Sequence, residues 1–152
     1  MLTKGRIMNR ELSIHKSIKF NADKTKVWDA LVNPNIIKEY LFGTEVISEW
    51  KAGSAMIFQG EWEGQKYKDK GNILAIAQEN LFQYNYWSRF SGLEDKEDNY
   101  SLITYQVEEE DGQTILTLTQ QGFANEQAKE HSDVSWGMIL EKMKELIEKD
   151  KK

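Results

Sequence analysis

Three tyrosines, Tyr84, Tyr86 and Tyr105, are the side chains whose spacing in this sequence best suits joint action on one molecule. Tyr84 and Tyr86 are two residues apart in an alternating segment, and residues two apart in a β-strand face the same side. Tyr105 alternates in the same way between Ile103 and Val107. A phenol hydroxyl both donates and accepts hydrogen bonds. Inward-facing tyrosines could therefore bind the polar group of a desolvated ligand, or stabilise charge that develops in a reaction.

Similar periodicity predicts more aromatic and apolar side chains on inner faces. Phe82 shares the face of Tyr84, and Met56, Phe58 and Trp62 share a face of an earlier strand. Residues near the C-terminus repeat at helical spacing and form one apolar stripe. The residues predicted to bind a ligand are Trp28, Tyr40, Phe58, Trp62, Tyr84, Tyr86, Tyr105, Trp136, Ile139 and Met143.

Two interpretations of these aromatic residues are open. For any one ring, packing in an ordinary core is the simpler interpretation. Taken together, three inward phenols each need a hydrogen-bond partner, and water in a cavity supplies one more readily than a dry core does. The set therefore favours a cavity for a ligand with rings or a lipid-like body and one or two hydrogen-bonding groups.

The sequence contains no motif for covalent or metal-dependent chemistry. It has no Cys, which excludes thiol nucleophiles, disulfides and thiolate zinc sites. Its two histidines, His15 and His131, lack metal-ligand spacing, and Glu61 and Glu63 alternate outward. Residues 60–64 lack the Lys-Ser or Lys-Thr of a phosphate loop, and no glycine-flanked serine elbow occurs. We therefore predict no catalytic residue, no metal and no cofactor.

Charge and hydropathy limit the possible partners. The net charge of −5, with dispersed Lys and Arg, argues against a nucleic-acid partner, because phosphate binding needs clustered positive charge. No apolar run approaches the roughly 18 residues of a membrane span. The first ten residues lack the continuous apolar stretch of a secretory signal. Together with the absence of Cys, this predicts a cytoplasmic protein.

Hydrophobic periodicity predicts the elements that position these side chains. Residues 1–10 are predicted to be an N-terminal extension and residues 11–150 a single domain. A half-buried strand at residues 11–20 precedes two short helices that Pro34 separates. Further strands are predicted at residues 45–48, 54–62, 67–77, 81–87, 100–108 and 113–120, and an amphipathic helix at 125–149. The acidic segment 92–99 is predicted to be an exposed, mobile loop.

This order of elements predicts an α+β fold. One helix cannot cover both faces of six or seven antiparallel strands, so we expect a curved antiparallel sheet wrapped around the long C-terminal helix. The two short helices follow the first strand. Wherever the sheet does not close fully on the long helix, a cavity is expected between them.

Several sequence segments, distributed over nearly the whole chain, resemble those of a known family. They are Lys26 to Pro34, Ala52 to Ser54, Lys70 to Leu74, Thr114 to Phe123, and the closing helix around Trp136. In this order and spacing they resemble the activator of heat-shock-protein ATPase homologue family, within the START-like (SRPBCC) superfamily. The resemblance implies a helix-grip (START/Bet v 1-like) fold. Tyr40 stands where many relatives carry Trp, which would change the lining of a shared cavity.

Three functions follow as alternatives. The first is binding of a small apolar, aromatic or lipid-like molecule between the C-terminal helix and the sheet, by a monomer or homodimer without enzymatic activity. The second is a cyclase- or dehydratase-type enzyme that uses Tyr84, Tyr86, Tyr105 or Gln120. The third, implied by the resemblance, is a single-domain protein-binding module with a partner such as a chaperone, approached through an acidic surface.

Overall fold

The computed structural model describes residues 7–149, which form one curved sheet, three α-helices and two 3-10 turns. The strands are β1 (Asn9–Phe20), β2 (Glu45–Ser48), β3 (Ala55–Trp62), β4 (Gln65–Ala77), β5 (Leu81–Trp87), β6 (Ser101–Glu110) and β7 (Gln113–Phe123). The helices are α1 (Lys24–Val32), α2 (Pro34–Tyr40) and α3 (Glu126–Glu148), and the turns are η1 (Arg89–Ser91) and η2 (Glu97–Asn99). The predicted α+β fold is confirmed.

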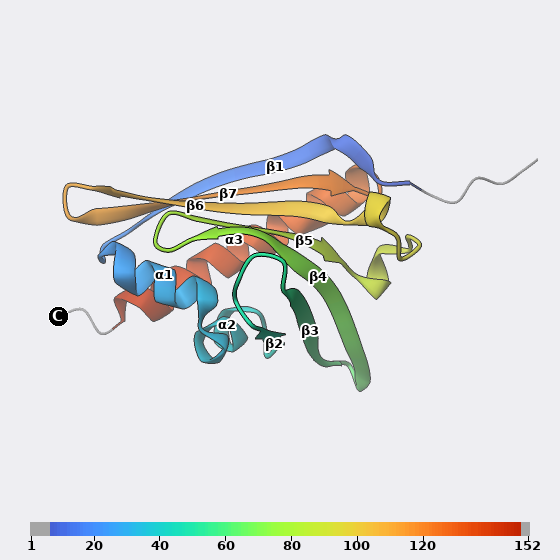
Figure 1. Cartoon of the computed structure of the whole chain (residues 1–152), viewed down its shortest axis with the longest axis horizontal. Helices are drawn as coiled ribbons and strands as arrows, with labels where there is room; N and C mark the ends of the chain where they lie inside the picture. The colour runs from blue at the N-terminus through green and yellow to red at the C-terminus, as the bar shows by residue number, and fades with distance from the viewer. Residues whose placement is uncertain (1–6, 150–152) are drawn as a thin grey trace, which may run out of the picture.

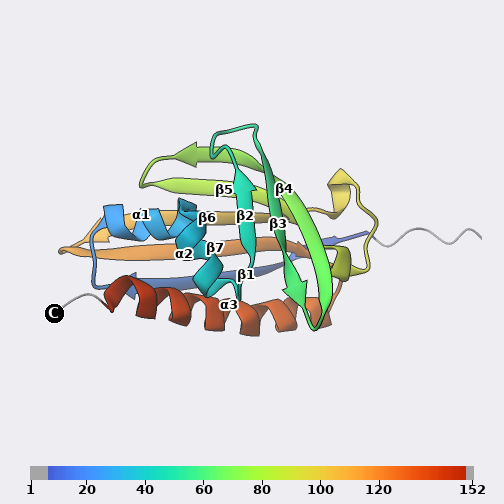
Figure 2. The same cartoon turned by 90° about the horizontal axis from the view of Figure 1, so that it is seen from below.

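The seven strands form one antiparallel sheet in the order β1-β7-β6-β5-β4-β3-β2 (Figure 1). The last strand, β7, pairs with the first, β1, whereas the neighbours among β2 to β7 in the sheet are also neighbours along the chain. Figure 2 shows that β1, β7 and β6 run alongside α3, whereas β2 and β3 cross it. The sheet is therefore strongly twisted and wraps around the helix, as expected of a long antiparallel meander.

Two tight hairpin turns fix the register of two strand pairs. Glu63-Gly64 joins β3 to β4, with φ values of 48° and 82°, and Asp111-Gly112 joins β6 to β7, with φ values of 51° and 79°. Positive φ at both central residues is the geometry that suits the right-handed twist of a two-residue hairpin. Glycine at the second position of each turn adopts this positive φ without steric cost.

Asn33 turns the chain sharply between the two short helices. Its backbone N–H ends α1 by donating to the Asp29 carbonyl at 2.9 Å, and its side chain accepts from the Asn35 N–H at 3.0 Å to begin α2. Pro34 occupies the first position of α2, where its missing N–H costs nothing. The turn directs the residues after α2 toward α3, and α2 packs against α3.

The sheet begins before the predicted domain boundary. Asn9, the first residue of β1, is opposite Phe123 of β7, and the backbone N–H of Met8 donates to the Asn99 side chain at 2.9 Å. Residues 9 and 10 therefore belong to the sheet. Residues 1–6 of the predicted extension lie outside the described residues.

The prediction that residues 92–99 form an exposed loop is wrong for two of them. Leu93 and Asn99 are buried. The Leu93 carbonyl accepts from the Trp87 indole at 3.2 Å, and the Asn99 amide donates to the Glu94 carbonyl at 3.0 Å. The acidic composition of the segment does not indicate that these two residues are buried. Their hydrogen bonds hold the segment against the sheet.

Helix α3 closes on only one part of the sheet. Its buried face, formed by Trp136, Ile139, Leu140, Met143 and Ile147, packs mainly against β1, β7, α1 and α2. Close to α1 the interior is filled by rings around Phe82, which lies 6.4 Å from Trp28, 6.0 Å from Trp50 and 6.1 Å from Tyr105. The space beneath β3, β4 and β5 lies beyond this packed region.

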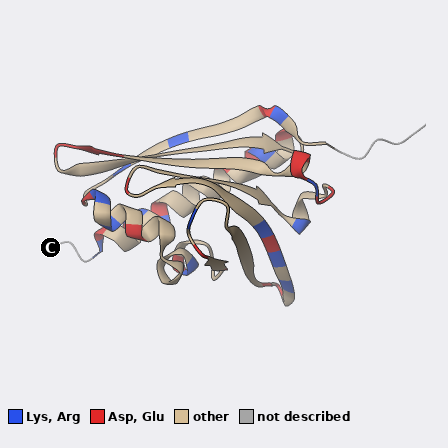
Figure 3. Cartoon of the chain, viewed as in Figure 1, with Lys and Arg blue, Asp and Glu red and all other residues tan. Residues whose placement is uncertain are grey.

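Within residues 7–149, no helix is long and apolar enough to cross a membrane. Lys and Arg are distributed over several helices and strands (Figure 3).

Candidate ligand-binding cavity

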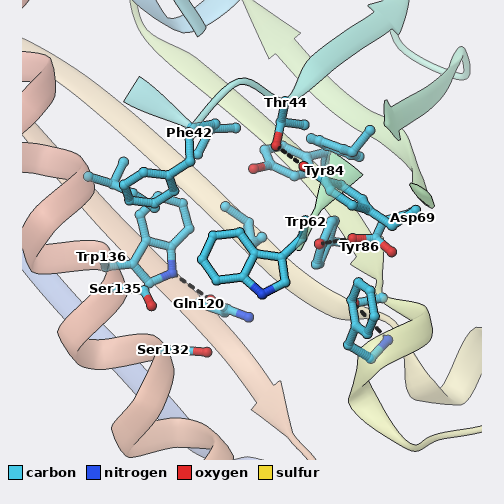
Figure 4. A pocket seen from close by; sticks show the side chains of 17 residues that line it. Phe42, Thr44, Trp62, Asp69, Tyr84, Tyr86, Gln120, Ser132, Ser135 and Trp136 are labelled. Carbon is cyan, nitrogen blue, oxygen red and sulfur yellow. Dashed lines mark hydrogen bonds between the residues drawn. The ribbon is translucent and has the colours of Figure 1, made fainter. Parts of the chain in front are cut away.

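A cavity of about 480 Å³ opens between α3 and strands β3 to β5 (Figure 4). It lies where the sheet curves away from the helix, and the segments after α2 and β5 border it. The lining residues are Leu41, Phe42, Thr44, Phe58, Trp62, Tyr67, Asp69, Tyr84, Tyr86, Ser88, Phe90, Ile103, Gln120, Ser132, Ser135, Trp136 and Ile139. Most of this surface is apolar or aromatic, with a few polar groups, which is typical of a small-molecule site.

The structure divides the ten sequence-predicted residues into two groups. Six of them line the cavity: Phe58, Trp62, Tyr84, Tyr86, Trp136 and Ile139. The other four, Trp28, Tyr40, Tyr105 and Met143, do not line it and are buried in the packed part of the interior. Tyr105 supports the cavity wall from behind, since its ring lies 6.4 Å from that of Tyr84 and 6.1 Å from that of Trp136, both of which line the cavity.

Protein groups, and not water in a cavity, provide the hydrogen-bond partners of the interior phenols. Tyr40 donates to the Ala30 carbonyl at 2.8 Å, Tyr86 donates to Asp69 at 2.7 Å, and the Tyr105 hydroxyl hydrogen-bonds that of Tyr84. Within the described part of the chain, no buried side-chain nitrogen or oxygen lacks a partner. The cavity therefore follows from where α3 docks, and not from unsatisfied hydroxyls.

Gln120 of β7 holds Trp136 in place through a chain of buried hydrogen bonds. Its Oε1 accepts from the Trp136 indole N–H at 2.6 Å, and its Nε2 donates to Ser101 at 3.2 Å. Ser101 in turn donates to the Gly122 carbonyl at 2.7 Å. Because these bonds fix the amide, the Trp136 ring presents a constant face to the cavity.

Asp69 is a buried carboxylate that the sequence interpretation did not select. It lies on the inner face of β4 and accepts from the Tyr86 hydroxyl at 2.7 Å and from the Arg89 backbone N–H at 3.2 Å. A signal was present, because Lys66, Lys68 and Lys70 alternate with it along the strand, which predicts that the acid faces the opposite side. Among the described residues, no group of three or more potential metal ligands occurs.

Three exposed aromatic side chains surround the entrance of the cavity. Phe42, Trp62 and Phe90 are 58%, 62% and 59% exposed, although all three also line the cavity. They come from the α2–β2 connection, the end of β3 and η1. The Thr44 and Tyr67 hydroxyls, 2.5 Å apart, join the α2–β2 connection to β4. The cavity therefore reaches the surface through an aromatic rim.

Burial keeps the interior phenols in their neutral form. It is the largest cause of the raised pKa of Tyr40, Tyr84, Tyr86 and Tyr105, because a phenolate would lose its hydration. For Tyr86, the nearby Asp69 charge raises the pKa further. At neutral pH these phenols therefore donate hydrogen bonds and do not act as bases.

These pKa shifts predict a stability loss at high pH. A phenol with a folded-state pKa above its unfolded value of about 10 stabilises the fold fully below that pH, and the contribution is lost as the pH rises toward the folded pKa. We expect Tyr40, Tyr84, Tyr86 and Tyr105 to remain un-ionised near pH 10 in the native protein and to ionise only with unfolding. Absorbance titration with and without denaturant tests this. Reversible ionisation of all six tyrosines near pH 10 in the native state would contradict it.

A curved antiparallel sheet that grips a long C-terminal helix defines a helix-grip protein. A family model described as "Activator of Hsp90 ATPase homolog 1-like protein" matches residues 21–148. The chain belongs to this family, as its sequence resemblance indicated. This fold supports either a ligand-binding role or a role as an activator-like module.

Solved structures agree with this assignment. The chain is similar to the solution structure of ChR145 from Cytophaga hutchinsonii, with 39% identity, a TM-score of 0.80, and coverage of 93% of this chain and 97% of that one. The crystal structure of CalU16 from Micromonospora echinospora has 21% identity and a TM-score of 0.71, and 89% and 75% of the two chains are covered. The Aha1 dimer from Colwellia psychrerythraea has 15% identity, a TM-score of 0.73, and 93% and 99% coverage. These last two likenesses concern the fold alone. No match was found among the curated proteins.

Proposed function

We propose that this protein binds a small apolar, ring-bearing or lipid-like molecule in the cavity between α3 and β3 to β5. The observation that carries the proposal is the cavity itself, whose volume of about 480 Å³ falls within the range of roughly 300–1,000 Å³ typical of ligand sites. An apolar ligand in a cavity of this size would make many packing contacts with the rings that line it.

The aromatic rim supports the same proposal. Phe42, Trp62 and Phe90 leave more than half of their side-chain surface in water, which is unfavourable for rings of this size. A ligand that enters between them would remove part of this surface from water. Aromatic rings also lose little conformational freedom on binding, so the rim provides contact area at low entropic cost.

Titration with a fluorescent apolar probe tests the proposal. We expect saturable binding at one site, with a Kd in the range of about 1 to 100 μM. Trp62→Ala should weaken it by about tenfold, since each 1.4 kcal/mol of lost contact is a factor of ten. Leu74→Ala is the matched control, because Leu74 is exposed on β4 but does not line the cavity. The absence of saturable binding to the folded protein would refute the proposal, and an equal effect of both variants would refute the location.

A second candidate function, the activator-like protein-binding module, is favoured by one surface feature. Val134 and Met138 lie one turn apart on α3 and are 66% and 53% exposed, so they form an apolar strip on the outer side of the helix. A chaperone partner would have to cover this strip. Retention of a chaperone on the immobilised protein, and its loss with Met138→Lys, would support this function; binding of a ligand in the cavity does not by itself produce such retention.

A further inference from the structure

We infer that the cavity selects apolar ligands whose polar end is a hydrogen-bond donor, a protonated amine above all, and that Asp69 determines this choice. The inference rests on the proposed function and specifies the ligand class of the same cavity. It excludes apolar carboxylic acids, which would otherwise suit the ring-lined interior equally well.

The charge of the cavity lining is of one sign, negative. Among the described residues that line the cavity, none is Lys, Arg or His, and Asp69 is the one acidic residue. A carboxylate head group would therefore meet no cation there and would be placed near a second negative charge. A cationic head group would meet a buried anion in surroundings of low dielectric, where attraction is strong.

Asp69 has no ion-pair partner of its own. Its side chain is only 4% exposed, and none of the ion pairs in the described part of the chain includes it. Lys68 and Lys70 flank it in sequence but are exposed on the opposite face of β4, and Lys70 pairs with Asp95. Along β4, Figure 3 shows acidic and basic positions close together on the same strand. Buried charges in proteins are normally paired, so an unpaired carboxylate beside a cavity favours a cation that arrives with the ligand.

The carboxylate also has free acceptor capacity. A carboxylate can accept about four hydrogen bonds, and Asp69 accepts two, one at each oxygen, from the Tyr86 hydroxyl and the Arg89 N–H. These two donors hold its oxygens in a fixed orientation at the edge of the cavity, where Asp69 is opposite Phe58 of β3 (Figure 4). An ammonium group carries three donors and no acceptor, so it fits the remaining positions, and a hydroxyl fits one of them.

Three probes with the same decyl chain test the inference: decylamine, decanol and decanoate, each below the concentration at which it aggregates. Their affinities are measured by displacement of the fluorescent apolar probe at neutral pH. We expect the amine to bind at least about tenfold more tightly than the acid, with the alcohol between them. This wild-type comparison needs no variant to fold.

Asp69→Asn tests whether this residue is the cause. The substitution preserves shape and removes the charge, so it should reduce the preference for the amine over the acid to less than about threefold. Glu61→Gln is the matched control, because it changes the net charge equally at an exposed position of the adjacent strand. It should leave the preference unchanged.

The outcomes separate this inference from the proposed function. If the acid binds the wild-type protein as tightly as the amine, the inference is overturned, whereas the proposed function stands. If the preference persists in Asp69→Asn, or disappears equally in Glu61→Gln, the assignment to Asp69 is overturned. If none of the three probes displaces the fluorescent probe and that probe itself does not bind, the proposed function fails, and the inference fails with it.

Discussion

Alanine in place of Gly71 is expected to lower the free energy of unfolding by about 3 kcal/mol or more. A Cβ atom at this position would lie 1.9 Å from the backbone oxygen of Asn85, far inside contact distance. Because the clash is with the backbone of the neighbouring strand, no side-chain rotation can relieve it. Gly71 is opposite Tyr86 in the β4–β5 ladder, so the strands must separate beside the Tyr86–Asp69 hydrogen bond.

Gly137→Ala is the matched control, and its effect should have the opposite sign. Gly137 lies within α3, and apart from its two chain neighbours and the nearby backbone of the helix itself, no atom lies within 4 Å of the Cβ it would gain. Alanine there should raise the free energy of unfolding by about 0.5–1 kcal/mol, because glycine is a poor helix former. Urea denaturation of both variants measures the difference. If Gly71→Ala is as stable as the wild-type protein, the close approach of β4 and β5 is contradicted.

A tryptophan at position 135 is expected to abolish ligand binding with little effect on folding. Ser135 lines the cavity from α3, so the larger side chain would occupy the space that a ligand needs. We expect the affinity for the fluorescent probe to fall by about a hundredfold or more, which corresponds to the loss of roughly 2.7 kcal/mol of contacts. The free energy of unfolding should change by less than about 1 kcal/mol, since the new ring fills existing space.

Glu130→Trp is the control that shows whether a new tryptophan on α3 weakens probe binding wherever it is placed. Glu130 is exposed on α3 and does not line the cavity, so this variant should bind the probe as the wild-type protein does. Thermal unfolding confirms that both variants are folded. Wild-type affinity in the folded Ser135→Trp variant would show that the probe binds elsewhere.

Local sequence patterns were sufficient to predict most of the fold. The bounds predicted for β2 and β5, residues 45–48 and 81–87, are those of the structure, because alternation there is regular and turn residues flank each strand. The end of α1 at Asn33-Pro34 was predictable for a similar reason, since proline restricts the residue before it. Such signals act over a few residues and need no knowledge of tertiary contacts.

The division of the interior into packed core and cavity was not predictable from the same patterns. Phe58 and Trp28 both face inward, yet only Phe58 lines the cavity, because α3 docks on β1 and β7 and leaves β3 to β5 uncovered. Its docking on β1 depends on contacts between residues more than a hundred positions apart, such as Lys144 and Lys19. Periodicity identifies a buried face but does not reveal what covers it.

Asp69 shows a second limit of sequence interpretation. Acidic residues are mostly exposed, so an Asp between lysines is read first as part of a solvated strand. Strict alternation with Lys68 and Lys70 contradicts that interpretation, but only once the lysines are assigned to the outer face. The residue that we infer to select the ligand was therefore indicated by its neighbours more than by its own type.

The most direct test of a guest beneath α3 uses the five tryptophan indole N–H groups as reporters in a nitrogen–proton correlation spectrum, recorded during titration with decanol. Trp62 and Trp136 line the cavity, whereas Trp28 and Trp50 pack against Phe82 in the filled region. We predict that the signals of Trp62 and Trp136 shift in a saturable manner, whereas those of Trp28 and Trp50 remain in place. If other signals shift to saturation while those of Trp62 and Trp136 do not move, the ligand binds elsewhere and the account is contradicted.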